Sequence, residues 1–151
     1  MRLLVSLLLL ATYSPAQIRT VPLPGKSPLV TFRIVFTTGS ASDPAGKAGL
    51  AYLTAMMLAN SGTQDLTYKQ IVEAFYPMAG GVSAQVDHEM CTFSGATHTD
   101  NLTAYYKLLR AMLLDPGWRE DDFTRVKQDA INNLKVGLRG NNDEELSLIH
   151  I

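Results

Sequence analysis

The stretch Gly49-Leu50-Ala51-Tyr52-Leu53-Thr54-Ala55-Met56-Met57-Leu58, which continues to Gly62 and Thr63, carries the clearest indication of the fold. Its apolar residues at helical spacing are Leu50, Leu53, Met57 and Leu58. This spacing predicts a helix that lasts to Asn60, where Gly62 follows as a stop signal. Residues 39–49 contain three Gly and one Pro, and so they predict a loop before the helix.

The segment before this loop predicts a strand. Apolar residues alternate with polar ones over residues 30–37, with one interruption at Val35. The alternating apolar residues are Val30, Phe32, Ile34 and Phe36. A period of two is typical of a strand with one buried face. Residues 17–28 include three Pro and predict an irregular lead-in to this strand.

The first 16 residues have the features of a secretory signal peptide. The positive start Met1-Arg2 precedes an apolar run from Leu3 to Ala11 that is too short to span a bilayer. Small residues follow in Ser14-Pro15-Ala16, as they do before a cleavage site. The alternative is a short buried helix. A signal peptide predicts that the protein is exported, to the periplasm or to the extracellular space.

A second helix has a well-marked start. Thr67 and Gln70 have the spacing of a capping box, in which each side chain pairs with an amide at the helix start. Leu66 and Ile71 flank them at the spacing of a hydrophobic staple. The helix ends before Pro77, which cannot continue it.

Two further strands and another helix are predicted next. Gly80-Gly81 opens an alternating run to His88, and residues 90–97 are placed to return as its hairpin partner after a turn at residues 87–89. Asp100 is placed to cap a helix that ends at Asp115. The apolar side of that helix consists of Leu102, Tyr105, Leu109, Met112 and Leu113.

The last helix begins in the acidic run at residues 120–122, which suits the positive end of a helix dipole. The residues expected to point inward are Phe123, Val126, Ile131, Leu134 and Leu138. The predicted order is strand, helix, helix, strand, strand, helix, helix. It predicts an α+β fold with a mostly antiparallel sheet and helices packed on one face.

The composition narrows the class of protein. The 151 residues, 46% of them apolar, predict one globular domain. A net charge of -1, with Lys and Arg spread along the chain, argues against nucleic acid as a partner. Cys91 is the single Cys, so an internal disulfide is excluded. Its strand-like surroundings favour a small buried side chain over a nucleophile.

Four stretches of this chain resemble, in order, the first domain of insulinase/pitrilysin-type zinc metallopeptidases. They are residues 29–40, residues 49–63, Gly80-Gly81-Val82-Ser83-Ala84 and the helix from Phe123. The resemblance implies the fold of the LuxS-like and processing-peptidase-like metallopeptidases over residues 29–145, with the domain truncated at its C-terminal end. Residues 146–151 resemble a cloning or assembly artefact, and we expect them to lie outside the fold.

The zinc motif of active members is altered in this chain. Active members read Gly-Leu-Ala-His-x-x-Glu-His-Met-Leu, in which two His four residues apart bind zinc and the Glu activates the metal-bound water. Here Tyr52 and Met56 stand at the His positions, and Ala55 stands at the Glu position. Tyr and Met are poor zinc ligands, and Ala transfers no proton.

The third ligand of active members is a Glu on a later helix whose acidic residues are seven apart. Matching that helix from Phe123 places Val126 and Asn133 at the two Glu positions, with Asp129 as the nearest acidic residue. The resemblance therefore implies a chain that binds no zinc and is not an enzyme on its own. Zinc is then expected only in an active partner.

Alternatives stay open for these residues. Tyr52 and Met56 either fill the space that the metal leaves or line a surface that contacts peptide. A substitute metal site at His88, Cys91 and His98 lacks a further ligand at suitable spacing, so a solvated hairpin is the simpler interpretation.

The strand at Val82, Ser83 and Ala84 resembles the family's edge strand, which holds an extended peptide by backbone pairing. The alternative is an ordinary sheet edge, in which the preceding Gly pair only begins the strand.

Members of this family form two related halves around a chamber, and some pair an active subunit with one that lacks the zinc motif. The resemblance implies a non-catalytic half that binds peptide and pairs with an active H-x-x-E-H partner in an exported protease. The alternative is a structural or assembly subunit with no role in proteolysis. A third hypothesis is hydrolysis by unorthodox ligands, in which His88 or His98 would hold zinc.

Overall fold

The structure, a computed structural model, describes the backbone of residues 19–149 and the side chains of residues 19–136. The predicted signal peptide, residues 1–16, lies outside this range. Residues 19–28 contain no helix or strand. The helices and strands that follow have the predicted order and are β1 (Leu29–Phe36), α1 (Leu50–Asn60), α2 (Tyr68–Phe75), β2 (Ser83–Val86), β3 (Cys91–His98), α3 (Leu102–Leu114) and α4 (Glu120–Ile149).

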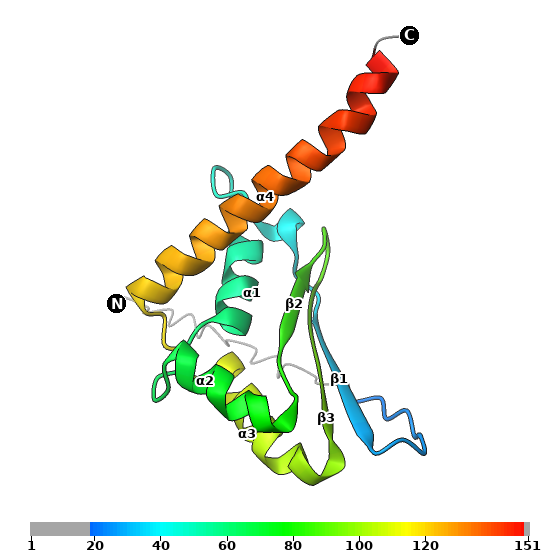
Figure 1. Ribbon diagram of the computed structural model, residues 1–151, viewed down its shortest axis with the longest axis vertical. Coiled ribbons are helices and arrows are strands. Elements are labelled where there is room, and N and C mark those ends of the chain that lie inside the picture. The colour runs from blue at the N-terminus through cyan, green and yellow to red at the C-terminus, as the bar shows by residue number, and fades with distance from the viewer. Residues whose placement is uncertain (1–18, 150–151) are drawn as a thin grey trace, which may run out of the picture.

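The three strands form one antiparallel sheet in the order β1-β3-β2. β2 and β3 form the predicted hairpin, in which Val86 lies opposite Cys91 and the Asp87 amide donates to the Met90 carbonyl at 2.8 Å. β1 pairs with the other side of β3. Figure 1 shows α1, α2 and α3 on the same side of this sheet. The prediction of an α+β fold with helices on one face is confirmed.

The alternation along β1 determines which side chains face the helices. Phe32 and Ile34 are partly buried and pack into the core, as Phe93 of β3 does, whereas Arg33 between them is exposed. The predicted alternation is wrong at Phe36, which is 45% exposed. Phe36 lies at the end of β1, where its ring meets Phe93 edge to face at 5.8 Å.

Tyr105 of α3 lies at the centre of the core that α2 and α3 share. Its ring stacks on Phe32 with 5.6 Å between centroids and meets Phe75 at 5.3 Å. Its hydroxyl donates to the Gly81 carbonyl at 2.7 Å, and burial raises the pKa of this phenol. Gly95 of β3 leaves room for the hydroxyl, because a Cβ there would overlap the Tyr105 oxygen.

The start of α2 confirms the predicted capping box. The Thr67 hydroxyl accepts from the Gln70 amide at 3.4 Å, and the Gln70 side chain accepts from the Thr67 amide at 2.8 Å. Leu66 packs against the buried cluster that contains Ile71, as a hydrophobic staple requires.

The start of α3 differs from the prediction. A 3-10 turn at Thr99–Asn101 precedes the helix, and the N-cap is Asn101, without a capping hydrogen bond from its side chain. The predicted cap, Asp100, lies inside this turn instead. Its amide donates to Nδ1 of His98 at 3.2 Å. The turn satisfies the amide locally, so the helix starts later than the sequence pattern indicates.

The loop after β1 is attached both to the hairpin and to α1. The Ser40 and Ala41 amides donate to carbonyls of the β2–β3 turn at 3.0 and 2.9 Å. Gly39 lies against the same turn, where a Cβ would come within 2.7 Å of the His88 carbonyl. Asp43 accepts from the amides of Gly49 and Ala51 at 2.7 and 2.8 Å, so its carboxylate caps the start of α1.

α4 begins at Glu120, as predicted, and packs against α1. Val126 is buried, but Phe123 and Leu134 are 36% and 62% exposed, so the prediction that both point inward is wrong. Figure 1 shows that the second half of α4 extends away from the sheet and the other helices. Val136, the last apolar residue whose side chain the structure describes, is accordingly exposed.

At the far end of α4, beyond residue 136, the structure describes the backbone alone. Leu138 lies beyond the described side chains. The helix continues to Ile149, through most of the tail at residues 146–151, and the artefactual origin of that tail stays a prediction. Within residues 19–149, no helix combines the length and apolarity that crossing a bilayer requires.

Candidate functional site

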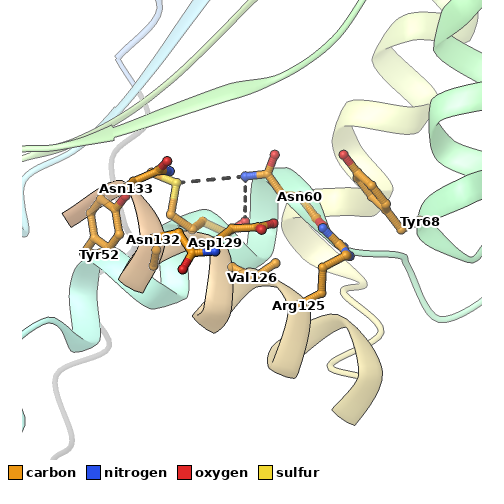
Figure 2. A pocket seen from close by; sticks show the side chains of 10 residues that line it. Tyr52, Asn60, Tyr68, Arg125, Val126, Asp129, Asn132 and Asn133 are labelled. Atoms are coloured by element: carbon orange, nitrogen blue, oxygen red, sulfur yellow. Dashed lines mark hydrogen bonds between the residues drawn. The ribbon is translucent and has the colours of Figure 1, made fainter. Parts of the chain in front are cut away.

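A pocket of about 310 Å³ lies between α1 and α4. Its lining residues are Tyr52, Met56, Asn60, Tyr68, Arg125, Val126, Asp129, Ala130, Asn132 and Asn133. They come from α1, the start of α2 and the first half of α4. Figure 2 shows Tyr52 and Asn133 towards one end of the pocket and Tyr68 and Arg125 towards the other.

The pocket contains most of the positions at which the resemblance places an altered zinc site. Tyr52 and Met56, one turn apart on α1, line it together with Val126 and Asn133 of α4. Residues four apart lie on one face of a helix, so this meeting follows from the helical spacing once α4 packs on α1. Two separate parts of the sequence pattern therefore converge on one place.

Ala55, at the position of the catalytic Glu, does not line this pocket. It is 2% exposed and packs with Ala59, Cys91 and Phe93. On the helix it is turned from Met56 towards the sheet, where it borders a second, more apolar hollow of about 330 Å³.

The residues present do not fit a zinc ion. A catalytic zinc takes three ligands from His, Cys, Asp or Glu and leaves a fourth position open. The pocket offers Asp129 as its one carboxylate, and no imidazole or thiol lines it. Within the described part of the chain, no group of three or more His, Cys, Asp or Glu is placed to hold a metal.

Arg125 is held at the end of the pocket by three contacts. Its Nη2 lies 3.0 Å from Oδ1 of the buried Asp122 and also donates to the Asn60 carbonyl. Its guanidinium lies over the Tyr68 ring, 4.0 Å from the centroid. The other Asp122 oxygen accepts from the Gly62 amide at 3.0 Å, so this ion pair joins the start of α4 to the end of α1.

The sequence pattern did not identify Arg125, Asn60 or Tyr68 as members of the site. The spacing of Asp122 and Arg125 by three residues indicates an ion pair on a helix. The two other contacts of Arg125 come from α1 and α2, and no local pattern shows them.

The predicted peptide-binding residues Val82, Ser83 and Ala84 lie at and just before the start of β2, which is an edge of the three-stranded sheet. The Ser83 hydroxyl donates to the Ser94 carbonyl at 3.3 Å. A Cβ on Gly81 would meet nothing within 4 Å, whereas one on Gly80 would contact the Tyr105 ring at 3.1 Å. Gly80 therefore serves the core, and Gly81 faces open space.

The structure does not bring His88, Cys91 and His98 together as a ligand set. His88 precedes β3 and His98 ends it, so the strand separates the two imidazoles. Cys91 is buried, which raises the pKa of its thiol, as expected of a packing residue. Nδ1 of His98 accepts from the Asp100 amide at 3.2 Å and lies 3.2 Å from Oδ2 of the same residue.

Solved structures of known proteins share this fold. An inactive domain of a peptidase M16 from Pseudomonas fluorescens matches with a TM-score of 0.66 and 22% identity, over 74% of this chain and 27% of that one. A protease from Helicobacter pylori matches with a TM-score of 0.64 and 19% identity, over 73% and 26%. Pitrilysin matches with a TM-score of 0.66 and 18% identity, over 74% and 12%.

The coverage values also compare the length of this chain with that of these proteins. It spans about a quarter of the length of the first two proteins and 12% of pitrilysin. Among curated protein sequences, none gives a significant match. At these identities the structural matches establish the fold.

The sequence itself matches a family profile described as Insulinase (Peptidase family M16) over residues 24–137, well over half of the chain. This range contains every element from β1 to the first half of α4, including both walls of the pocket. The chain therefore belongs to the insulinase family, peptidase family M16.

Proposed function

We propose that this chain is a non-catalytic member of the insulinase family that holds an extended peptide and works together with an active partner. The partner is a family member with an intact H-x-x-E-H motif, and it supplies the zinc and the hydrolysis. The protein acts after export, in the periplasm or outside the cell.

The pocket between α1 and α4 is the observation that carries the non-catalytic part of this proposal. It stands where the resemblance places the zinc ligands, and it is lined by Tyr52, Met56, Val126 and Asn133. These side chains provide neither a zinc ligand set nor a general base at this place. An inactive domain of a peptidase M16 from P. fluorescens shares this fold, which supports the non-catalytic assignment.

The position of β2 supports the peptide-holding part. β2 lies at a sheet edge, Gly81 before it faces open space, and Ser83 at its start is exposed. An extended peptide that adds to this edge forms backbone hydrogen bonds, which tolerate many side chains.

Reconstitution tests the proposal. The full-length protein is mixed with a family member from the same organism that carries the intact motif, and cleavage of an internally quenched extended peptide is followed. We expect neither stoichiometric zinc nor cleavage from this protein alone, and cleavage by the mixture beyond that of the partner alone. The control is a partner in which Gln replaces the motif Glu, which gives no cleavage in either arm.

Two results would contradict the proposal. Stoichiometric zinc together with cleavage by this protein alone would show that it is an enzyme. A stable complex whose cleavage rate equals that of the partner alone would assign this protein to assembly instead.

Export is tested separately. N-terminal sequencing of the mature protein from the periplasmic or secreted fraction is expected to begin after Ala16. An intact Met1 in the cytosolic fraction would contradict it.

A further inference from the structure

We infer that the pocket between α1 and α4 binds a positively charged side chain, Lys or Arg, of the peptide that this protein holds. The inference rests on the proposed function, because the side chain belongs to the peptide that lies along β2. In this chain, a recognition site for an organic cation would then stand where active members bind the metal.

The charges around the pocket favour a cation. Two ionised side chains line it, Arg125 and Asp129. Arg125 is neutralised by its ion pair with the buried Asp122. Within the described side chains, the Asp129 carboxylate forms neither an ion pair nor a hydrogen bond. The pocket therefore carries one uncompensated negative charge.

The hydrogen-bonding groups lead to the same class of ligand. Arg125 uses its Nη2 on Asp122 and on the Asn60 carbonyl. The Asn60 amide nitrogen donates to the Met56 carbonyl at 3.0 Å, which leaves its Oδ1 as an acceptor. Asp129 supplies acceptors only, and the ring of Tyr52 adds a face that attracts cations. These acceptors and this ring face suit a ligand that brings donors, as an ammonium or a guanidinium does.

The size and place of the pocket suit one side chain of a bound peptide. Its volume of about 310 Å³ is at the lower end of the range of ligand sites, roughly 300–1,000 Å³. α1 packs against β2, so a peptide that pairs with the β2 edge lies beside the helix that forms one wall of the pocket. A single carboxylate does not provide the ligand set of a metal ion, which favours an organic cation.

Binding of matched peptides to the full-length protein tests this inference. Two extended peptides are acetylated and amidated at their ends, labelled for fluorescence anisotropy, and differ only in a central Lys or norleucine. A third contains norleucine and has a free α-amino group. We expect the Lys peptide to bind roughly fivefold more tightly than either other peptide, the size of a partly screened charge pair.

Variants assign the preference to one carboxylate. Asp129→Asn is expected to remove the advantage of Lys and leave binding of the norleucine peptide unchanged. Asp121→Asn, which removes an exposed carboxylate from the same helix outside the pocket, is the matched control and keeps the full advantage. The Tm of both variants is measured to check that they are folded.

The outcomes separate this inference from the proposed function. Equal binding of all three peptides overturns the inference and leaves peptide holding intact. Tighter binding of the free-amine peptide than of the Lys peptide also overturns it, because the pocket would then hold a chain end. Binding of none of the peptides overturns the proposed function itself.

Discussion

The glycines around β2 show how single residues divide between core and surface. Gly80 and Gly95 both lie against Tyr105, and the Gly81 carbonyl accepts its hydroxyl. Two of the three glycines are therefore required by one buried tyrosine, whether or not a peptide approaches the edge. Gly81 alone faces open space, so it is the glycine whose replacement can affect peptide binding without disturbing the core.

Replacing Gly95 tests this division. Gly95→Ala places a Cβ on the Tyr105 oxygen and 2.7 Å from the Gly81 carbonyl. We expect it to lower the free energy of unfolding by about 3 kcal/mol, as overpacking and a lost hydrogen bond do together. Gly81→Ala, the matched control, is expected to change it by less than about 1 kcal/mol. Both values come from urea unfolding of the protein.

A double variant identifies the cause. In a Tyr105→Phe background the hydroxyl is absent, so Gly95→Ala is expected to cost clearly less than it does in the native sequence. An equal cost in the two backgrounds would show that the Tyr105 hydroxyl is not what excludes a side chain at position 95.

At the level of elements, the pocket exists because α4 is fixed to the end of α1. Asp122 is 8% exposed and accepts from the Gly62 amide, while Arg125 reaches the Asn60 carbonyl and covers Tyr68. These contacts of Asp122 and Arg125 determine where the rest of α4 passes α1. It thereby determines that Asn133 lines the pocket with Tyr52.

Removing Asp122 is expected to loosen the pairing of the two helices. Asp122→Ala leaves both the Gly62 amide and Arg125 without their partner, which costs about 2–3 kcal/mol of unfolding free energy. Asp121→Ala removes a neighbouring exposed carboxylate and is expected to cost about 0.3–1 kcal/mol, its interaction with the helix dipole. Chemical denaturation compares the two, and equal losses would contradict a specific role for Asp122.

In the sheet as a whole, one strand has a neighbouring strand on both sides, and the other two have a neighbour on one side only. β3 is hydrogen-bonded to β1 and to β2, whereas the outer amides of β2 lack a strand partner within the described residues. Alternate amides of an edge strand point away from the sheet. These amides are the groups that strand addition by a peptide would engage.

Amide hydrogen exchange on the full-length protein measures this difference. Without peptide, β3 is expected to exchange slowest of the three strands, because opening it breaks pairing on both sides. Saturation with the Lys peptide is expected to slow exchange in residues 83–86 and to leave β3 unchanged, β3 serving as the internal control. Protection that appears in β1 instead would place the peptide at the wrong edge.

Local patterns predicted the elements and their caps well. The capping box at Thr67 and Gln70, the alternation in β1 and the β2–β3 hairpin depend on residues close in sequence, so their geometry follows from spacing. The positions Tyr52 and Met56 were likewise recognisable from a motif within one helix. The order of the elements and the α+β class followed from these pieces.

Features that depend on distant contacts were not predictable. Leu134 has helical spacing but is exposed, and no local pattern shows which face of α4 lies against another element. Asp100 resembles a cap, yet His98 and a 3-10 turn take its place. The role of Arg125 requires knowing that α1 and α2 lie beside it, which only the fold reveals.

The loop after β1 has a consequence for how this domain tolerates changes in length. Residues 40–43 are hydrogen-bonded to the β2–β3 turn at one end and cap α1 at the other, so they act as a spacer of fixed length between this turn and α1. An inserted residue there would shift α1 along β2 and take its wall of the pocket with it. Residues 44–48, between the Asp43 cap and the start of α1, are exposed. Doubling the length of such a loop costs only about 0.6 kcal/mol, so insertions are expected to be confined to residues 44–48.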